Sequence, residues 1–111
     1  MIQLFLRLTA PVGEVREVTE ALRSVMLPAR LARGCSRVEL CAEVERPEVL
    51  CYLEEWDIEE EFQGELRMDR MNRLLEVMEC ASEPPILELR FVTDRRGLEY
   101  IEAARCGTST G

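Results

Sequence analysis

Large aliphatic and more polar residues alternate at the start of the chain. Every second residue from Ile2 to Leu8 is Ile or Leu. A period of two is the side-chain period of a β-strand, so this segment predicts a strand with one strongly apolar face. The same pattern predicts further strands over residues 36–44, 49–56 and 86–92.

Four other segments repeat apolar residues at intervals of three and four, which is the period of an amphipathic helix. They cover residues 15–26, 58–66, 69–78 and 98–105. Pro28 predicts the end, or an irregular continuation, of the first helix. Asp57 with Glu60 predicts a capping box at the start of the second helix, and Asp69 is a candidate cap for the third.

When the adjacent helical stretches 58–66 and 69–78 are taken as one helical unit, the order of these elements is strand, helix, strand, strand, helix, strand, followed by a short helical piece. This order predicts an α+β fold of the ferredoxin-like βαββαβ type with an antiparallel sheet. We expect residues 1–105 to form a single domain and residues 106–111 a flexible C-terminal tail. A hairpin turn over residues 45–48 would place Arg37 opposite Glu55, Leu40 opposite Tyr52 and Cys41 opposite Cys51.

One face of the predicted sheet must be covered by helices, and the other mixes charged with apolar residues. The mixed face carries Phe5, Arg7, Arg37, Glu39, Cys41, Glu43, Glu88 and Arg90. It is too polar for a core, but its opposite charges would suit a second copy related by a two-fold axis. We therefore expect a homodimer, and the alternative is a sheet face exposed to solvent.

Composition removes several classes of function. The 111 residues include no His, and all 14 basic residues are Arg, so there is no Lys. The absence of His excludes Ser-His-Asp catalysis, His-bound haem and nearly all catalytic zinc sites, and the absence of Lys excludes Schiff-base chemistry. A net charge of −8 argues against a nucleic-acid partner.

The five cysteines contain no C-x-x-C spacing, so they indicate neither a zinc site nor a disulfide framework. We expect them to act as small buried hydrophobic residues, and we expect no metal. No apolar run is long enough to cross a membrane, and the first residues lack the basic segment of a signal peptide. These features predict a cytoplasmic protein without a membrane partner.

Four short motifs carry a family resemblance. They are Arg33-Gly34-Cys35, residues 52–57 (YLEEWD), residues 66–75 (LRMDRMNRLL) and residues 96–105 (RGLEYIEAAR). At these motifs, and over nearly the whole chain, the sequence resembles the antibiotic biosynthesis monooxygenase family. The resemblance implies a dimeric α+β barrel that oxygenates quinol- or polyketide-like aromatics without a cofactor, the substrate donating electrons to O2 as its enolate or phenolate.

The resemblance also implies a pocket between the helices and the sheet of each subunit. Its apolar, substrate-binding lining would be Phe62, Leu66, Met71, Leu75, Met78, Leu89 and Phe91. Trp56, at the edge of this pocket, matches the tryptophan of the actinorhodin-type oxygenases. The histidines that family members often carry fall on Glu65 and Arg70, which is a departure from the family pattern.

Four residues are candidates for catalysis. Trp56 would hydrogen-bond a substrate oxygen, Tyr52 and Tyr100 would handle protons, and Arg90 would stabilise a phenolate. The structural alternatives are a core anchor for Trp56, ordinary amphipathic residues for the tyrosines and an interface ion pair for Arg90. The sequence therefore leaves two functions open: a cofactor-independent monooxygenase, or a non-catalytic dimeric module of the same fold that holds a small apolar or aromatic ligand.

Overall fold

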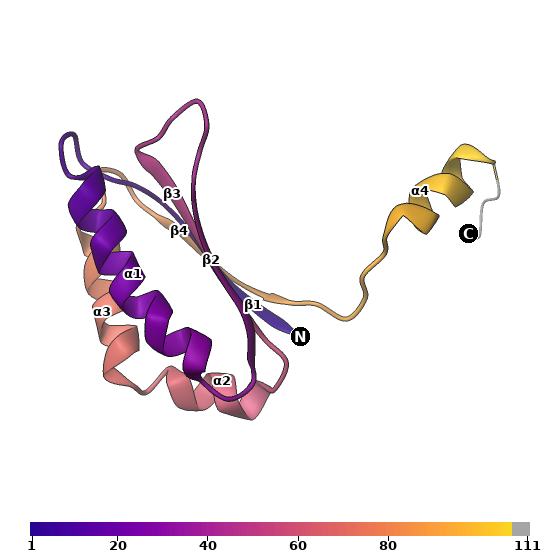
Figure 1. Cartoon of the computed structure of the whole chain (residues 1–111), viewed down its shortest axis with the longest axis horizontal. Coiled ribbons are helices and arrows are strands. Elements are labelled where there is room, and N and C mark those ends of the chain that lie inside the picture. Colours follow the sequence, from indigo (N-terminus) through magenta and orange to yellow (C-terminus); the bar gives the residue numbers. More distant parts are fainter. Residues whose placement is uncertain (108–111) are drawn as a thin grey trace.

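The computed structural model describes residues 1–107 of the chain. Its elements are β1 (Ile2–Thr9), α1 (Val15–Leu31), β2 (Cys35–Ala42), β3 (Val49–Trp56), α2 (Glu59–Glu65), α3 (Asp69–Glu79), β4 (Ile86–Phe91) and α4 (Leu98–Arg105). The strands form one antiparallel sheet in the order β2-β3-β1-β4, with α1 and α3 on one face (Figure 1). This is the predicted ferredoxin-like arrangement. Of the predicted tail, residues 108–111 lie outside the described part.

The core lies between the sheet and the pair of helices α1 and α3. Ile2, Leu4, Leu6 and Leu8 of β1 are each no more than 4% exposed, as the alternation predicted. Leu22 and Val25 of α1 and Leu74 of α3 meet them and have no exposed surface. Burying each such side chain contributes roughly 1.5–3 kcal/mol to folding, so this layer holds the helices on the sheet.

The predicted register of β2 and β3 is confirmed. The paired residues are Arg37 with Glu55, Leu40 with Tyr52 and Cys41 with Cys51. An irregularity between Cys35 and Arg37 shifts the pairing at the start of β2. Because successive side chains of a strand alternate between faces, Glu54 lies on the helix-covered face and Glu55 on the opposite face.

The first helix is longer than predicted. α1 continues through Pro28 as α-helix to Leu31, so it neither ends at the proline nor becomes irregular there. Proline removes one backbone N–H, but Ala29 directly after it has no exposed surface. Packing of this last turn against the core outweighs the missing hydrogen bond, since tertiary contacts supply most of the stability of a helix.

The predicted caps of the next two helices are wrong. Ile58 occupies the N-cap of α2 without a side-chain hydrogen bond, and Asp69 is the first residue of α3, not its cap. The N–H of Asp57 instead donates to the carbonyl of Gly34 at 2.8 Å, which keeps Asp57 in line with the sheet. Gly34 has a φ of +86°, and an added Cβ would lie 3.2 Å from Ile58, so this turn favours glycine.

Helices α1 and α3 leave β4 uncovered. All six of its residues are exposed. Leu89 lies opposite Leu4 in the ladder, so it points to the same side as the core, yet it is 45% exposed. Beyond β4 the chain leaves the sheet as an extended segment that ends in α4, which lies apart from the rest of the protein (Figure 1).

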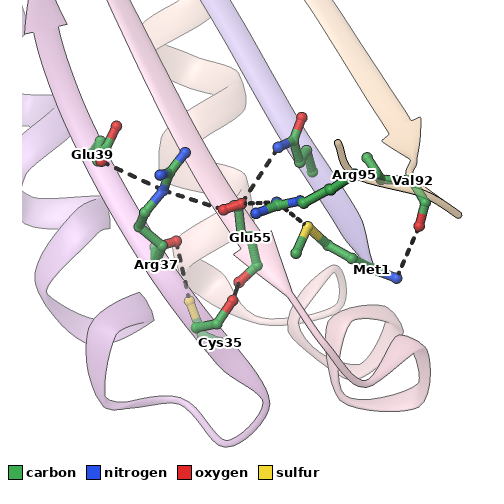
Figure 2. Close-up of polar contacts among 9 residues, drawn as sticks. Met1, Cys35, Arg37, Glu39, Glu55, Val92 and Arg95 are labelled. Atoms are coloured by element: carbon green, nitrogen blue, oxygen red, sulfur yellow. Dashed lines mark hydrogen bonds and ion pairs between the residues drawn. The ribbon is translucent and has the colours of Figure 1, made fainter. Parts of the chain in front are cut away.

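This extended segment is fastened to the open face of the sheet at one buried carboxylate. Glu55 is 2% exposed and accepts hydrogen bonds from Arg95 at 2.5 Å and from Gln3 at 3.4 Å. Arg37 forms an ion pair with it at 3.2 Å (Figure 2). The segment that leads to α4 is therefore anchored by charge beside the start of β1.

Candidate functional site

A charged cluster lies inside the helix-covered side of the sheet. Glu54 has no exposed surface, and its carboxylate accepts hydrogen bonds from the hydroxyl of Tyr52 and from Nε1 of Trp56 at 2.9 Å. The three residues alternate along β3, so their side chains reach the same face. The two predicted catalytic residues of β3 thus meet on one carboxylate that the sequence analysis did not select.

Helix α3 supplies the cation of this cluster. Arg70 is 4% exposed and donates from Nη1 and Nη2 to the two oxygens of Glu54, at 2.5 Å and 3.5 Å. Its Nε donates to Oε2 of Glu65, in the last turn of α2, at 3.2 Å. Arg70 therefore connects a fully buried carboxylate to one whose side chain is 22% exposed.

The surroundings fix the protonation of this cluster. Burial, and then the charge and hydrogen bond of Glu54, raise the pKa of Tyr52 far above its ordinary value, so Tyr52 is a neutral donor. Burial lowers the pKa of Arg70, but the hydrogen bond and charge of Glu54 outweigh it, and the net shift is upward. Burial, followed by the charge of Glu54, raises the pKa of Cys35, whose thiol stays protonated. Arg70 is thus a permanent cation beside neutral donors.

The cluster reaches the surface at an open depression of about 490 Å³. The depression is lined by Pro28, Leu31, Ala32, Glu65, Met68, Asp69, Arg70 and Arg73. Its walls come from the end of α1, the end of α2 and the start of α3. Arg70 and Glu65, joined by their hydrogen bond, are therefore neighbours in the wall of this depression.

The predicted apolar lining is divided between the core and the surface. Phe62 and Met71 are buried in the same hydrophobic cluster as Trp56, and the rings of Phe62 and Trp56 are 5.8 Å apart. Met78 is partly buried against that cluster. The other four predicted lining residues, Leu66, Leu75, Leu89 and Phe91, are exposed. The structure thus brings Phe62 and Met71 close to the charged cluster and leaves these four on the surface.

The other two predicted catalytic residues lie away from Glu54 in the single chain. Arg90 is on the open face of the sheet, 4.3 Å above the ring of Phe5, and forms a 3.0 Å ion pair with Glu88. Tyr100 belongs to α4 and is 58% exposed. The structural alternative for Arg90 was an ion pair in a dimer interface; its ion pair with Glu88 is present, and the location in an interface stays a prediction.

The sequence analysis missed Glu54 and Arg70, although the position of each in the apolar pattern indicates that it is buried. Glu54 stands between Tyr52 and Trp56 in a strand of period two, which places its carboxylate on the apolar face. Arg70 lies four residues before Leu74, within the apolar stripe of α3. A charged residue on an apolar face requires a buried partner, and the two residues supply it to each other.

No protein-family model and no curated protein matches this chain. A crystal structure named antibiotic biosynthesis monooxygenase does match, with a TM-score of 0.71 and 14% identity over 85% of this chain and 100% of that one. The chain has the antibiotic biosynthesis monooxygenase fold. A Deinococcus radiodurans protein, to which the same name is given provisionally, also matches. Its TM-score is 0.76, with 12% identity over 87% of this chain and 97% of that one.

A conserved protein from Methanosarcina mazei shares the fold as well, with a TM-score of 0.71 and 22% identity over 80% of this chain and 89% of that one. At these identities the likeness establishes the fold alone, because one fold hosts many reactions. Within residues 1–107, no group of three or more Cys, Asp or Glu side chains is arranged to hold a metal ion. None of the helices in that range is long and apolar enough to span a membrane.

Proposed function

We propose that the protein is a cofactor-independent monooxygenase that oxidises a quinol- or polyketide-like aromatic with O2. The observation that supports this most directly is Arg70, a buried cation held by Glu54 at the wall of an open depression. A fixed guanidinium stabilises a phenolate or enolate, and such an anion is electron-rich enough to donate to O2. The monooxygenase fold is consistent with this chemistry.

In the proposed reaction, Glu65 accepts the acidic proton of the substrate and Arg70 holds the resulting anion. The substrate CH2 group and O2 then give a C=O group and water, so one oxygen atom enters the product and the other leaves with the two hydrogens. Tyr52 and Trp56 act as positioning residues, because their hydrogen bonds orient Glu54 and so keep Arg70 in place.

The protein is proposed to act as a homodimer in which the C-terminal third of each chain covers its partner. From β4 onward, the exposed large apolar residues are Ile86, Leu87, Leu89, Phe91, Leu98, Tyr100 and Ile101. Each chain presents both an uncovered strand, β4, and an uncovered helix, α4. A two-fold exchange of these elements would cover both sets at once, and it is the arrangement by which Tyr100 of one chain would approach the other.

The test is oxygen uptake by metal-free, flavin-free protein with a panel of anthrones and reduced quinols. We expect saturable uptake by the wild type and a decrease of about a hundredfold or more in Glu65→Gln, because the proton acceptor is lost. Glu61→Gln is the matched control, since it removes the same charge from the same helix at a side chain that pairs with Arg33. It should retain wild-type uptake.

A second function is favoured by the packing of Phe62 and Met71 inside the core, which leaves the interior filled at those positions. In this alternative the protein is a non-catalytic dimeric module that binds a small apolar or aromatic molecule. Quenching of the fluorescence of Trp56, the only tryptophan, would report binding of the same panel. Binding without uptake above the buffer blank would support the module and contradict the oxygenase.

A further inference from the structure

The depression at the ends of α1 and α2 has walls of different chemistry. The wall from α1 is apolar, and its Leu31 is 89% exposed. The wall from α2 and α3 carries the charged residues Glu65, Asp69, Arg70 and Arg73. Such a combination suits a molecule with a flat apolar face and a charged edge. The depression is on the helix side of the sheet, opposite the open face that we expect a second copy to cover.

Arg73 is a cation of this depression whose charge is not balanced by an ion pair. Arg70, by contrast, is buried and bonded to Glu54 and Glu65. Arg73 is exposed, and within residues 1–107 no carboxylate pairs with its guanidinium. Acidic residues outnumber basic ones by 22 to 14 in this chain, so a shortage of carboxylates does not explain the unpaired arginine. Its charge is therefore available to a ligand.

The carboxylates nearest to Arg73 along α3 do not use this charge. Asp69 and Glu76 stand one helical turn before and after it, and neither forms an ion pair in the described part of the chain. Asp69 is the first residue of α3, where the N–H groups of the first turn stabilise a carboxylate. Ion pairs between exposed residues three or four positions apart are weak, so a ligand carboxylate that accepts two hydrogen bonds from Arg73 can displace them.

The spacing of Arg70 and Arg73 limits the shape of such a ligand. The two residues line the same depression and stand three positions apart on α3. The Cβ atoms of residues at this spacing are about 5–6 Å apart, which is close to the distance between para substituents of an aromatic ring. A ring with an oxygen at Arg70 can therefore place a substituent of its far side at Arg73.

We propose that the ligand of this depression is an aromatic acid and that its carboxylate binds Arg73. The inference rests on the proposed function, because it takes the hydroxyl of the same molecule to be the group that Arg70 holds. Arginine suits this role, since its planar guanidinium donates two parallel hydrogen bonds to a carboxylate. Arg73 is then a specificity residue, which selects acids over neutral aromatics of the same shape.

The test is to compare 4-hydroxy-1-naphthoate with 4-hydroxy-1-naphthamide by isothermal titration calorimetry under argon. The two ligands share the ring, the hydroxyl group and nearly the same shape, but only the first is an anion at neutral pH. We expect the wild type to bind the acid about tenfold or more tightly than the amide, because a hydrogen bond between charged groups is lost with the amide. In Arg73→Gln this preference for the acid should disappear.

Arg67→Gln is the matched control. Arg67 is also exposed and without an ion pair within residues 1–107, but it does not line the depression. Its substitution removes the same charge and should leave the preference for the acid unchanged. Arg73→Lys keeps the charge without the planar pair of donors, so it should keep part of the preference.

The titration does not depend on turnover, so this inference and the proposed oxygenase fail separately. Preference for the acid that requires Arg73, without oxygen uptake, would support the inference and contradict the oxygenase. Equal binding of the acid and the amide by the wild type, no binding of either, or a preference that persists in Arg73→Gln would overturn the inference.

Discussion

At the scale of single residues, Glu54 has no exposed surface, so Arg70 and not water balances the charge of its carboxylate. Removing one partner of a buried ion pair leaves the other charge uncompensated, which costs about 3–5 kcal/mol. We therefore expect Arg70→Met to lower the free energy of unfolding by about that amount, measured by urea denaturation. The control is Arg90→Met, whose ion pair with Glu88 is exposed; it should cost less than about 1 kcal/mol.

The double variant Glu54→Gln, Arg70→Met tests whether the unpaired charge is the cause. Gln removes the charge that Arg70→Met alone leaves behind, and it keeps an oxygen that accepts hydrogen bonds from Tyr52 and Trp56, so part of the loss should be recovered. Equal losses in Arg70→Met and Arg90→Met, or a double variant less stable than Arg70→Met, would contradict this account of the cluster.

The same residues show how far the sequence predicts the site. Trp56 was selected because it matches the tryptophan of the family that the sequence resembles, and Tyr52 because its hydroxyl could handle protons in a chain without His. The alternation of side chains along a strand placed Glu54 and Glu55 on opposite faces, as observed. The sequence pattern did not reveal the partner of Glu54. Arg70 stands 16 residues away from it, on a helix whose packing the local pattern does not specify.

At the scale of elements, periodicity predicted the strands and helices better than it predicted their ends. The last helix, Leu98–Arg105, has the predicted bounds, and the hairpin register is the predicted one. The continuation of α1 past Pro28 and the missing cap at Asp57 depend on burial of Ala29 and on a hydrogen bond to Gly34. Such tertiary contacts outweigh local propensity.

The segment before α4 is an element whose attachment should depend on pH. Burial alone would raise the pKa of Glu55, but hydrogen bonds from Arg95 and Gln3 and the charge of Arg37 lower it overall. A carboxyl group with a lowered pKa stabilises the fold above its unfolded pKa of about 4.3, and this stability is lost as the pH falls. We expect Glu55→Gln to reduce the loss of stability between pH 6 and pH 3.

Urea denaturation at a series of pH values measures this difference. Glu39→Gln is the matched control, because Glu39 also pairs with Arg37 but its side chain is 47% exposed. Its pH dependence should follow that of the wild type more closely. If both variants lose stability with pH in parallel with the wild type, the attachment at Glu55 does not contribute as proposed.

At the scale of the whole molecule, the single chain is more extended than its length requires. Its radius of gyration is 16.7 Å, whereas a compact chain of this length has one of about 13 Å. The excess comes from α4, which lies apart from the sheet with Leu98 and Ile101 more than half exposed (Figure 1). An isolated helix of this length is marginal in water, so α4 needs a surface to cover its apolar side.

We expect a second copy to supply that surface, and light scattering tests this. The wild type should have twice the mass of one chain, whereas Leu98→Ser with Ile101→Ser should shift the mass toward that of one chain, because the apolar contact is lost. Glu99→Gln with Glu102→Gln changes the polar side of the same helix and should preserve the dimer. A wild type of single-chain mass, or an apolar double variant that remains fully dimeric, would show that α4 does not join the two chains.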